Sequence, residues 1–161
     1  MESLLDAETF TAYVMEQQTT MFRTARAILR NDQDAEDAVQ DAILSAFSAR
    51  GNLRDPGKFK SWILRILANK CYDICRKRRA TVDLDQVQEV LPAADTDPTE
   101  RMTLWQAVLS LNPDLRVVVT LFYYEDLPIR EISQVVGISE AAVKTRLSRG
   151  RARLRLLLNQ E

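Results

Sequence analysis

The chain has 161 residues, of which 46% are hydrophobic, and its 22 Lys and Arg nearly balance 23 Asp and Glu for a formal net charge of −1. With few Gly and Pro, this composition is typical of a helical globular protein of one large domain or two small ones. No signal peptide is visible, and the longest apolar run, near residues 117–124, is too short to cross a bilayer. We therefore expect a cytoplasmic protein without direct membrane insertion.

The cysteine and histidine content argues against a metal site. The chain has no His and two Cys, Cys71 and Cys75, four residues apart in a predicted helix. A zinc site needs four ligands, usually with Cys or His among them, and two Cys on one helix do not supply them. We therefore expect no metal or cofactor, and interpret both Cys as small hydrophobic residues at the edge of a core.

Positive charge is concentrated in two segments of the chain. Residues 58–79 contain eight basic residues and one acid, and residues 136–161 contain six basic residues and two acids. Between them, residues 80–100 contain six acids and no base. The near-neutral total therefore hides two candidate surfaces for binding a polyanion such as nucleic acid.

Two helices are predicted before the first basic segment. Residues 8–30 are helical in composition, and the helix is broken at Asn31-Asp32. Residues 34–48 form an amphipathic helix, which Asp32 or Asp34 is expected to cap. Its apolar stripe comprises Ala35, Ala38, Val39, Ala42, Ile43, Ala46 and Phe47.

The polar side of this second helix carries an isolated apolar residue. Leu44 lies opposite the stripe, among Asp34, Asp37, Gln40 and Asp41. An isolated exposed Leu needs no explanation, but a Leu with a polar rim also resembles a small protein-docking spot.

A loop is predicted over residues 48–57, followed by a basic helix over residues 58–79. The apolar face of this helix holds Phe59, Ile63, Ile66, Leu67 and Ile74, with Cys71 at its edge. The opposite side holds Lys58, Ser61, Arg65, Asn69, Tyr72 and Arg76, and Trp62 lies on the border. Exposed cations interleaved with an amide and aromatic rings suit single-stranded DNA, although a solvated charged face fits equally well.

The acidic segment predicts a linker between two domains. Residues 80–98 contain Pro92, Pro98 and most of the acids, and when extended about twenty residues reach roughly 65–70 Å. The expected fold is all-α: two small helical domains, residues 1–79 and 99–161, joined by a flexible acidic linker. Such a linker could hold two DNA-binding modules about two helical turns of duplex apart.

The strongest local pattern is a helix-turn-helix over residues 127–158. Pro128 suits the first turn of a helix, Gly137 suits a left-handed turn, and Ser139 is a good N-cap for the next helix. That helix is expected to bury Val143, Leu147, Gly150, Leu154 and Leu157. Its other side carries cations and hydroxyls, as in helices that read the major groove of DNA.

The exposed side chains of this second helix suit two kinds of DNA contact. Thr145 and Ser148 can bond several base edges, and Lys144 or Arg149 can bond guanine. Arg151, Arg153 and Arg155 are expected to bind phosphates, which adds affinity without sequence information. The alternative is a helical hairpin with a basic exposed face.

Three segments, in the right order, resemble the bacterial RNA polymerase sigma factors. The polymerase-docking segment of that family resembles DAEDAVQDAILSAF, residues 34–47. Its −10 segment resembles FKSWILRILANK, residues 59–70, with Asp73 and Arg76 after it. Its −35 domain resembles residues 127–154, including VKTRLSRGRARL, residues 143–154. The short length is similar to the extracytoplasmic-function subfamily, whose linker runs through polymerase channels.

The resemblance implies a transcription initiation factor, not an enzyme, that binds core RNA polymerase and promoter DNA. Polymerase contacts would come from Asp34, Asp37, Gln40, Asp41 and Leu44. The −10 strand would be held by the loop of residues 48–57 and by Lys58, Trp62, Arg65, Asn69, Tyr72 and Arg76. The −35 duplex would be bound by Lys144, Thr145, Arg146, Ser148, Arg149 and Arg151.

The resemblance also implies a protein that is monomeric when free, takes no small-molecule substrate, and is held by an anti-sigma factor. The full aromatic wedge of housekeeping sigma factors is absent, which implies weaker melting and stricter promoter choice. Two other classes stay open. A stand-alone dimeric helix-turn-helix regulator leaves the basic helix and Leu44 unexplained, and a recombinase needs a larger catalytic domain than residues 1–79 offer.

Overall fold

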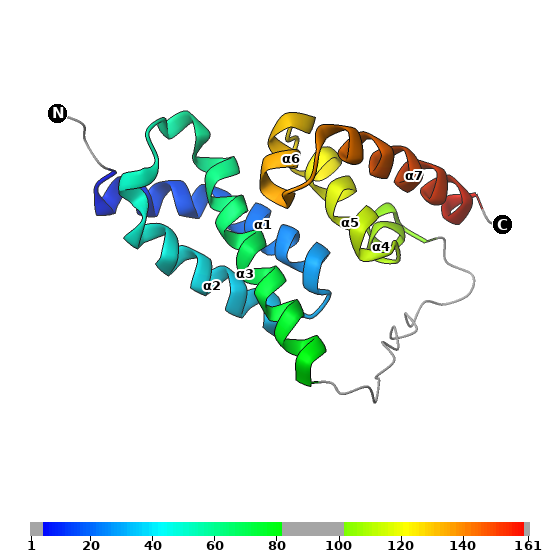
Figure 1. Ribbon diagram of the computed structural model, residues 1–161, viewed down its shortest axis with the longest axis horizontal. Coiled ribbons are helices and arrows are strands. Elements are labelled where there is room, and N and C mark those ends of the chain that lie inside the picture. Colours follow the sequence, from blue (N-terminus) through cyan, green and yellow to red (C-terminus); the bar gives the residue numbers. More distant parts are fainter. Residues whose placement is uncertain (1–4, 82–101, 160–161) are drawn as a thin grey trace.

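The computed structural model describes residues 5–81 and 102–159, and every regular element in these two ranges is helical, as expected for an all-α fold. Figure 1 shows three long helices at the N-terminal end and a group of shorter ones with a final long helix at the other. Residues 82–98 of the predicted linker lie outside the described residues. The seven α-helices in these ranges are α1 (Ala7–Leu29), α2 (Asp32–Ser48), α3 (Phe59–Thr81), α4 (Leu104–Leu109), α5 (Pro113–Val119), α6 (Ile129–Val136) and α7 (Glu140–Leu158).

Local capping residues define the first two helices. The Asp6 carboxylate accepts a hydrogen bond from the Thr9 amide at 2.7 Å, and Arg30 ends α1 in the left-handed conformation. The cap of α2 was expected at Asp32 or Asp34, but Asn31 occupies it, and its side-chain oxygen accepts from the Asp34 amide at 2.8 Å. Asn is at least as good an N-cap as Asp, which leaves both acids in the first turn near the positive end of the helix dipole.

Alanine lets α2 pack closely against its two neighbours. Four Ala of its predicted stripe are completely buried, whereas Val39 and Ile43 are half-buried and Phe47 is 37% exposed. A methyl side chain fills little space, so the α2 backbone can approach α1 and α3, both of which it contacts. The four buried positions are Ala35, Ala38, Ala42 and Ala46.

The helix-turn-helix forms where it was expected. Pro128 precedes the first turn of α6 as its N-cap, and Gly137 ends α6 at φ +82°, a conformation that glycine adopts readily. The Ser139 hydroxyl accepts from the Ala142 amide at 3.0 Å and starts α7. The expected α7 face is buried at Val143, Leu147, Gly150 and Leu154, and half-buried at Leu157.

Two short helices without a sequence-based prediction support this motif. Helix α4 begins with a capping box between Thr103 and Gln106, and α5 begins after Asn112 with Pro113 in its first turn. A π-helical turn, Thr120–Tyr124, then leads from α5 toward α6. Both α4 and α5 pack against α7, so they hold the second helix of the motif from behind.

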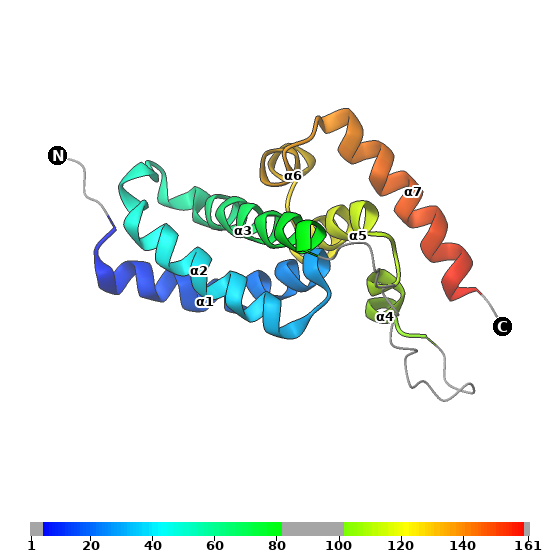
Figure 2. The same cartoon turned by 60° about the horizontal axis from the view of Figure 1, so that its bottom comes forward.

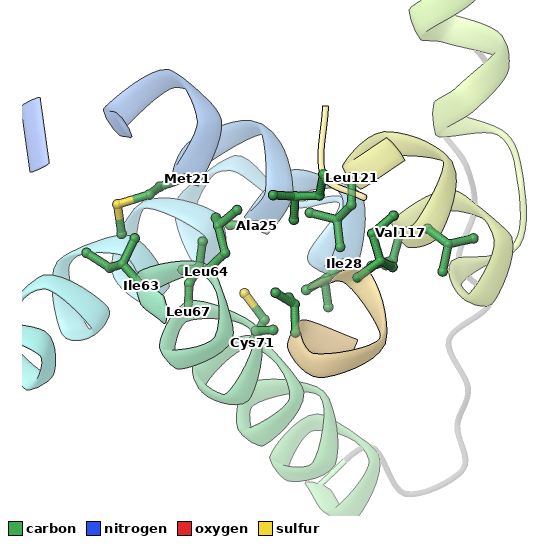
Figure 3. Close-up of a cluster of buried hydrophobic side chains, with 14 of the residues drawn as sticks. Met21, Ala25, Ile28, Ile63, Leu64, Leu67, Cys71, Val117 and Leu121 are labelled. Atoms are coloured by element: carbon green, nitrogen blue, oxygen red, sulfur yellow. The ribbon is translucent and has the colours of Figure 1, made fainter. Parts of the chain in front are cut away.

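The described parts of the two halves share one hydrophobic core. Helix α6 packs against α3, and α5 packs against α1, as the turned view in Figure 2 also shows. Figure 3 shows Val117 and Leu121 in the same cluster as Ile28 and the side chains of α3. Helix α3 therefore buries Leu64 and Ala68 in addition to its predicted face, and Cys71, expected at the edge, is completely buried.

Gly150 lies where α7 crosses α5, and it leaves no room for a side chain. A Cβ atom there would come within 2.6 Å of Cγ2 of Val119, a stiff, branched side chain. We expect Gly150→Ala to lower the free energy of unfolding by about 1–3 kcal/mol through overpacking, although Ala normally stabilises a helix relative to Gly. Thermal or urea unfolding would measure the change. Adding Val119→Ala should recover part of the loss; no recovery would contradict the steric explanation.

Candidate nucleic-acid interface

The outer face of α7 presents the side chains expected to contact duplex DNA. The buried face described above fixes the rotation of the helix, so the opposite side points to solvent. All five side chains other than Arg146 in the predicted set are exposed: Lys144, Thr145, Ser148, Arg149 and Arg151. Three cations and two hydroxyls along one face can bond both phosphate oxygens and base edges.

Arg146 differs from its neighbours on α7. Its side chain is 28% exposed, and a guanidinium nitrogen lies 3.9 Å from a carboxylate oxygen of Asp114, which sits in the first turn of α5. Arg146 therefore lies on the flank of α7 that turns toward α5, away from the centre of the exposed cationic face.

Four of the six side chains predicted for single-stranded DNA form an open face on α3. Lys58, Arg65, Asn69 and Arg76 are all exposed, and they follow one another at intervals of one or two helical turns. Arg76 is ion-paired with Asp73, one turn earlier. This face could follow the phosphates of an extended strand while the amide of Asn69 bonds a base.

The two aromatic side chains of that set are not fully open. Trp62 is half-buried, with its ring centroid 5.8 Å from that of Phe59, so one side of the indole remains available for stacking. Tyr72 was expected among the exposed cations, but it is half-buried against the C-terminal half. Burial raises the pKa of Tyr72 to about 12, and the charges of Arg146 and Asp114 are close enough to act on it. The expected exposure of Tyr72 was wrong because α3 packs against a second group of helices.

The loop before α3 is held by hydrogen bonds. It contains two 3₁₀ turns, Arg50–Asn52 and Pro56–Lys58. The Arg50 guanidinium donates to the carbonyl oxygens of Leu5 and Phe47, both at 2.8 Å, and lies over the Phe47 ring. At the second turn, the Asp55 carboxylate accepts from the Gly57 amide at 2.9 Å. A loop with fixed ends can present a defined surface to a strand lying along α3.

Helix α2 presents the acidic face expected to dock a protein. Leu44 is 69% exposed, and Asp37, Gln40 and Asp41 are exposed with it. Asp34 is not open to the same degree: its side chain is 16% exposed and forms an ion pair with Arg78 of α3 at 2.5 Å. The candidate docking surface is therefore Leu44 with three polar neighbours, and Asp34 also ties α2 to the basic end of α3.

Sequence reasoning missed the buried charges between the two halves. Arg116 and Glu125 are 2% and 1% exposed, in a region that the sequence presents as an apolar run with charged ends. No local pattern announces them, because their partners, Ala27, Ile28 and Arg23, are about a hundred residues away in the chain. These residues hold the two candidate DNA faces in their present relation.

The described residues contain no group of three or more His, Cys, Asp or Glu that could hold a metal ion. Across the same two ranges, no helix is both long and apolar enough to span a bilayer.

Comparison with known families gives two matches, one in each half of the chain. Residues 14–81 match the family model for Sigma-70 region 2, and residues 101–154 match that for Sigma-70, region 4. The chain is 34% identical over 140 residues to the ECF RNA polymerase sigma factor SigM of Mycobacterium tuberculosis, covering 86% of this chain and 71% of that protein. It is 32% identical over 141 residues to the RNA polymerase sigma factor SigV of Bacillus subtilis, covering 87% and 85%.

Solved structures show the same fold. The sigma factor RpoE of Bartonella quintana, crystallised with the anti-sigma factor NepR, superposes with a TM-score of 0.78 at 24% identity, covering 96% of this chain and 99% of that one. CnrH, solved in complex with the cytosolic domain of CnrY, gives a TM-score of 0.66 at 25% identity, covering 96% and 90%.

Proposed function

This chain belongs to the extracytoplasmic-function (ECF) RNA polymerase sigma factors, which direct transcription initiation and are not catalytic enzymes, and we propose that its two halves divide the recognition of one promoter. One observation carries the proposal: the described chain has two separate cationic faces, one on α3 and one on α7. A stand-alone dimeric regulator needs only the second. The same assignment implies action in the cytoplasm, where promoter DNA and the polymerase are found.

The α7 face binds the −35 element as intact duplex. Helix α7 is the second helix of a helix-turn-helix, and in this motif the residues near its N-terminus reach base edges. Lys144, Thr145, Ser148 and Arg149 lie in its first three turns and are exposed, and Arg151 follows where the helix passes the backbone. Arg146, on the flank toward α5, adds a phosphate contact once its distant pairing with Asp114 gives way.

The α3 face and its preceding loop bind the −10 element as a single strand. Lys58, Arg65 and Arg76 follow the phosphates, Asn69 bonds a base, and Trp62 offers a half-open ring for stacking. A base flipped out of the duplex into a pocket beside the loop of residues 48–57 would supply selectivity, which offsets the few kcal/mol of unstacking.

The acidic face of α2 docks core RNA polymerase. Leu44 supplies the apolar centre of the contact, and Asp37, Gln40 and Asp41 supply its polar rim. The domains proposed for these tasks are residues 1–79 and 99–161, and the acidic linker of residues 80–98 follows a polymerase channel that otherwise receives nucleic acid. A partner of the anti-sigma class, such as those bound to the structural neighbours, holds the protein inactive.

Reconstituted transcription tests this function directly. Core polymerase, the full chain and a pool of duplex templates with randomised upstream sequence are combined, and the transcripts are sequenced. We expect transcripts that require the protein, from templates that share two sequence elements about two helical turns apart. A dimer that binds palindromic DNA tightly by itself and leaves polymerase unaffected would contradict the proposal.

Leu44→Asp tests the polymerase-docking surface. The side chain is exposed, so the substitution should leave both halves folded, while a carboxylate at the centre of the contact should weaken core polymerase binding at least about tenfold. Fluorescence anisotropy of labelled protein against core polymerase would measure this. Leu156→Asp on α7 is a matched control, because Leu156 is 60% exposed and lies outside the docking surface. Equal binding by both variants would refute this role of Leu44.

Arg149→Ala and Arg153→Ala separate base contact from phosphate contact. Loss of a bidentate Arg–guanine contact costs about 1–3 kcal/mol, so Arg149→Ala should weaken −35 duplex binding about tenfold to a hundredfold and relax selectivity at one base pair. Arg153→Ala should weaken all sequences alike and lower the salt dependence. Competition assays on the −35 duplex recovered above would measure both. Loss of polymerase affinity in Arg149→Ala would indicate misfolding or a wrong assignment.

A further inference from the structure

A buried ion pair joins the two halves of the protein. The Glu125 carboxylate follows the π-helical turn and is 1% exposed, and it accepts two hydrogen bonds from Arg23 of α1, at 2.6 and 2.9 Å. This pairing raises the pKa of Arg23, which lies over the ring of Tyr124 as well. Lys60 of α3 donates to the backbone carbonyl oxygen of Glu125 at 2.5 Å. One residue of the C-terminal half thus binds cations from two helices of the N-terminal half.

A second buried cation, on α5, crosses the same boundary in the opposite direction. Arg116 is 2% exposed, and its guanidinium donates to the carbonyl oxygens of Ala27 and Ile28 in the last turn of α1. It also donates to the Leu111 carbonyl oxygen at 2.9 Å, within its own half. The last carbonyls of a helix have no partner within that helix and carry a partial negative charge, so Arg116 acts as an external cap on α1.

These contacts bring together residues that the two promoter elements would keep apart. Tyr72 of the proposed −10 set is covered by the C-terminal half, and the charge of Arg146 of the proposed −35 set acts on it. Elements about two helical turns of duplex apart are separated by roughly 70 Å, whereas α3 itself is about 35 Å long and packs against α6. The structure therefore corresponds to a closed form that cannot contact both elements at once.

We propose that Arg23–Glu125, supported by Arg116, is an interdomain lock that holds the free protein closed, and that the lock must open before both promoter elements are bound. Its consequence for promoters rests on the proposed function, but the lock itself does not. The charges suit a reversible contact. The side chain of Arg23 is 30% exposed and can be rehydrated on opening, whereas Glu125 is stable in the closed form only while it is paired.

The asymmetry in exposure predicts how variants behave. Arg23→Ala leaves a buried carboxylate without its guanidinium, so the closed form should lose roughly a hundredfold or more in its equilibrium with the open form. Arg23→Lys keeps the charge but loses the two-pronged geometry, and should lie between Arg23→Ala and the parent. Glu125→Gln should also open the protein. Asp126→Asn is the matched control, because it removes one carboxylate at the next, exposed position.

Energy transfer between dyes on the two halves tests the lock in the full chain. The dyes are placed at Thr11→Cys on α1 and Ala152→Cys on α7, both exposed, in a Cys75→Ser background; Cys71 is completely buried and stays. Transfer and circular dichroism are followed together against urea. We expect Arg23→Ala and Glu125→Gln to lose transfer at lower urea than the parent and Asp126→Asn, while the helix signal is unchanged. Coincident loss of both signals in every variant would show an ordinary core contact and overturn the lock.

Adding core polymerase and promoter DNA to the labelled parent tests the functional step. Transfer should fall as the complex forms, and Arg23→Ala should form it faster. Unchanged transfer in a complex that initiates transcription would overturn the claim that opening is required. Failure to bind polymerase at all would contradict the proposed function, while the urea experiment would still decide whether the lock exists.

Discussion

The burial of Glu125 constrains the relation between the two halves of the molecule. A carboxylate with almost no exposure to water has to be paired, because desolvating an isolated charge costs several kcal/mol. Its partner, Arg23, is on α1, so the end of the π-helical turn must lie against that helix. From there α6 is carried alongside α3, and α7, which follows after a short turn, is carried with it. The direction of the −35 face relative to the −10 face thus depends on one ion pair.

The elements that the sequence predicts well are those with local signals. Gly137 and Ser139 mark the turn of the helix-turn-helix, and both act as expected because a left-handed residue and an N-cap depend only on adjacent backbone. The cap of α2 was misplaced by one residue from Asp32 to Asn31, since both side chains can accept the same kind of hydrogen bond. The exposed cations of α7 follow from the same local periodicity, because that helix has one buried side.

Helix α3 shows why the rest could not be predicted. Its periodicity was interpreted with a single core in mind, but the helix packs against α1 and α2 on one side and against α6 on another. Leu64, Ala68 and Tyr72 consequently lie in a contact whose other side comes from residues that follow the acidic linker. Arg116 and Glu125 are of the same kind: a charged side chain in an amphipathic segment is expected at the surface, and only a distant partner reverses that expectation.

The distribution of cations links the closed fold to the proposed function. Arg23, Lys60 and Arg116 satisfy a carboxylate and carbonyl oxygens between the halves, so they serve folding, whereas Lys58, Arg65, Lys144 and Arg149 stay exposed. A lock built from apolar area alone would leave a large sticky surface when opened, and such surfaces promote aggregation. A lock built partly from charges exposes groups that water solvates well. Opening therefore exchanges paired charges for hydrated ones, which keeps the open form accessible to a polymerase that offers both DNA elements at once.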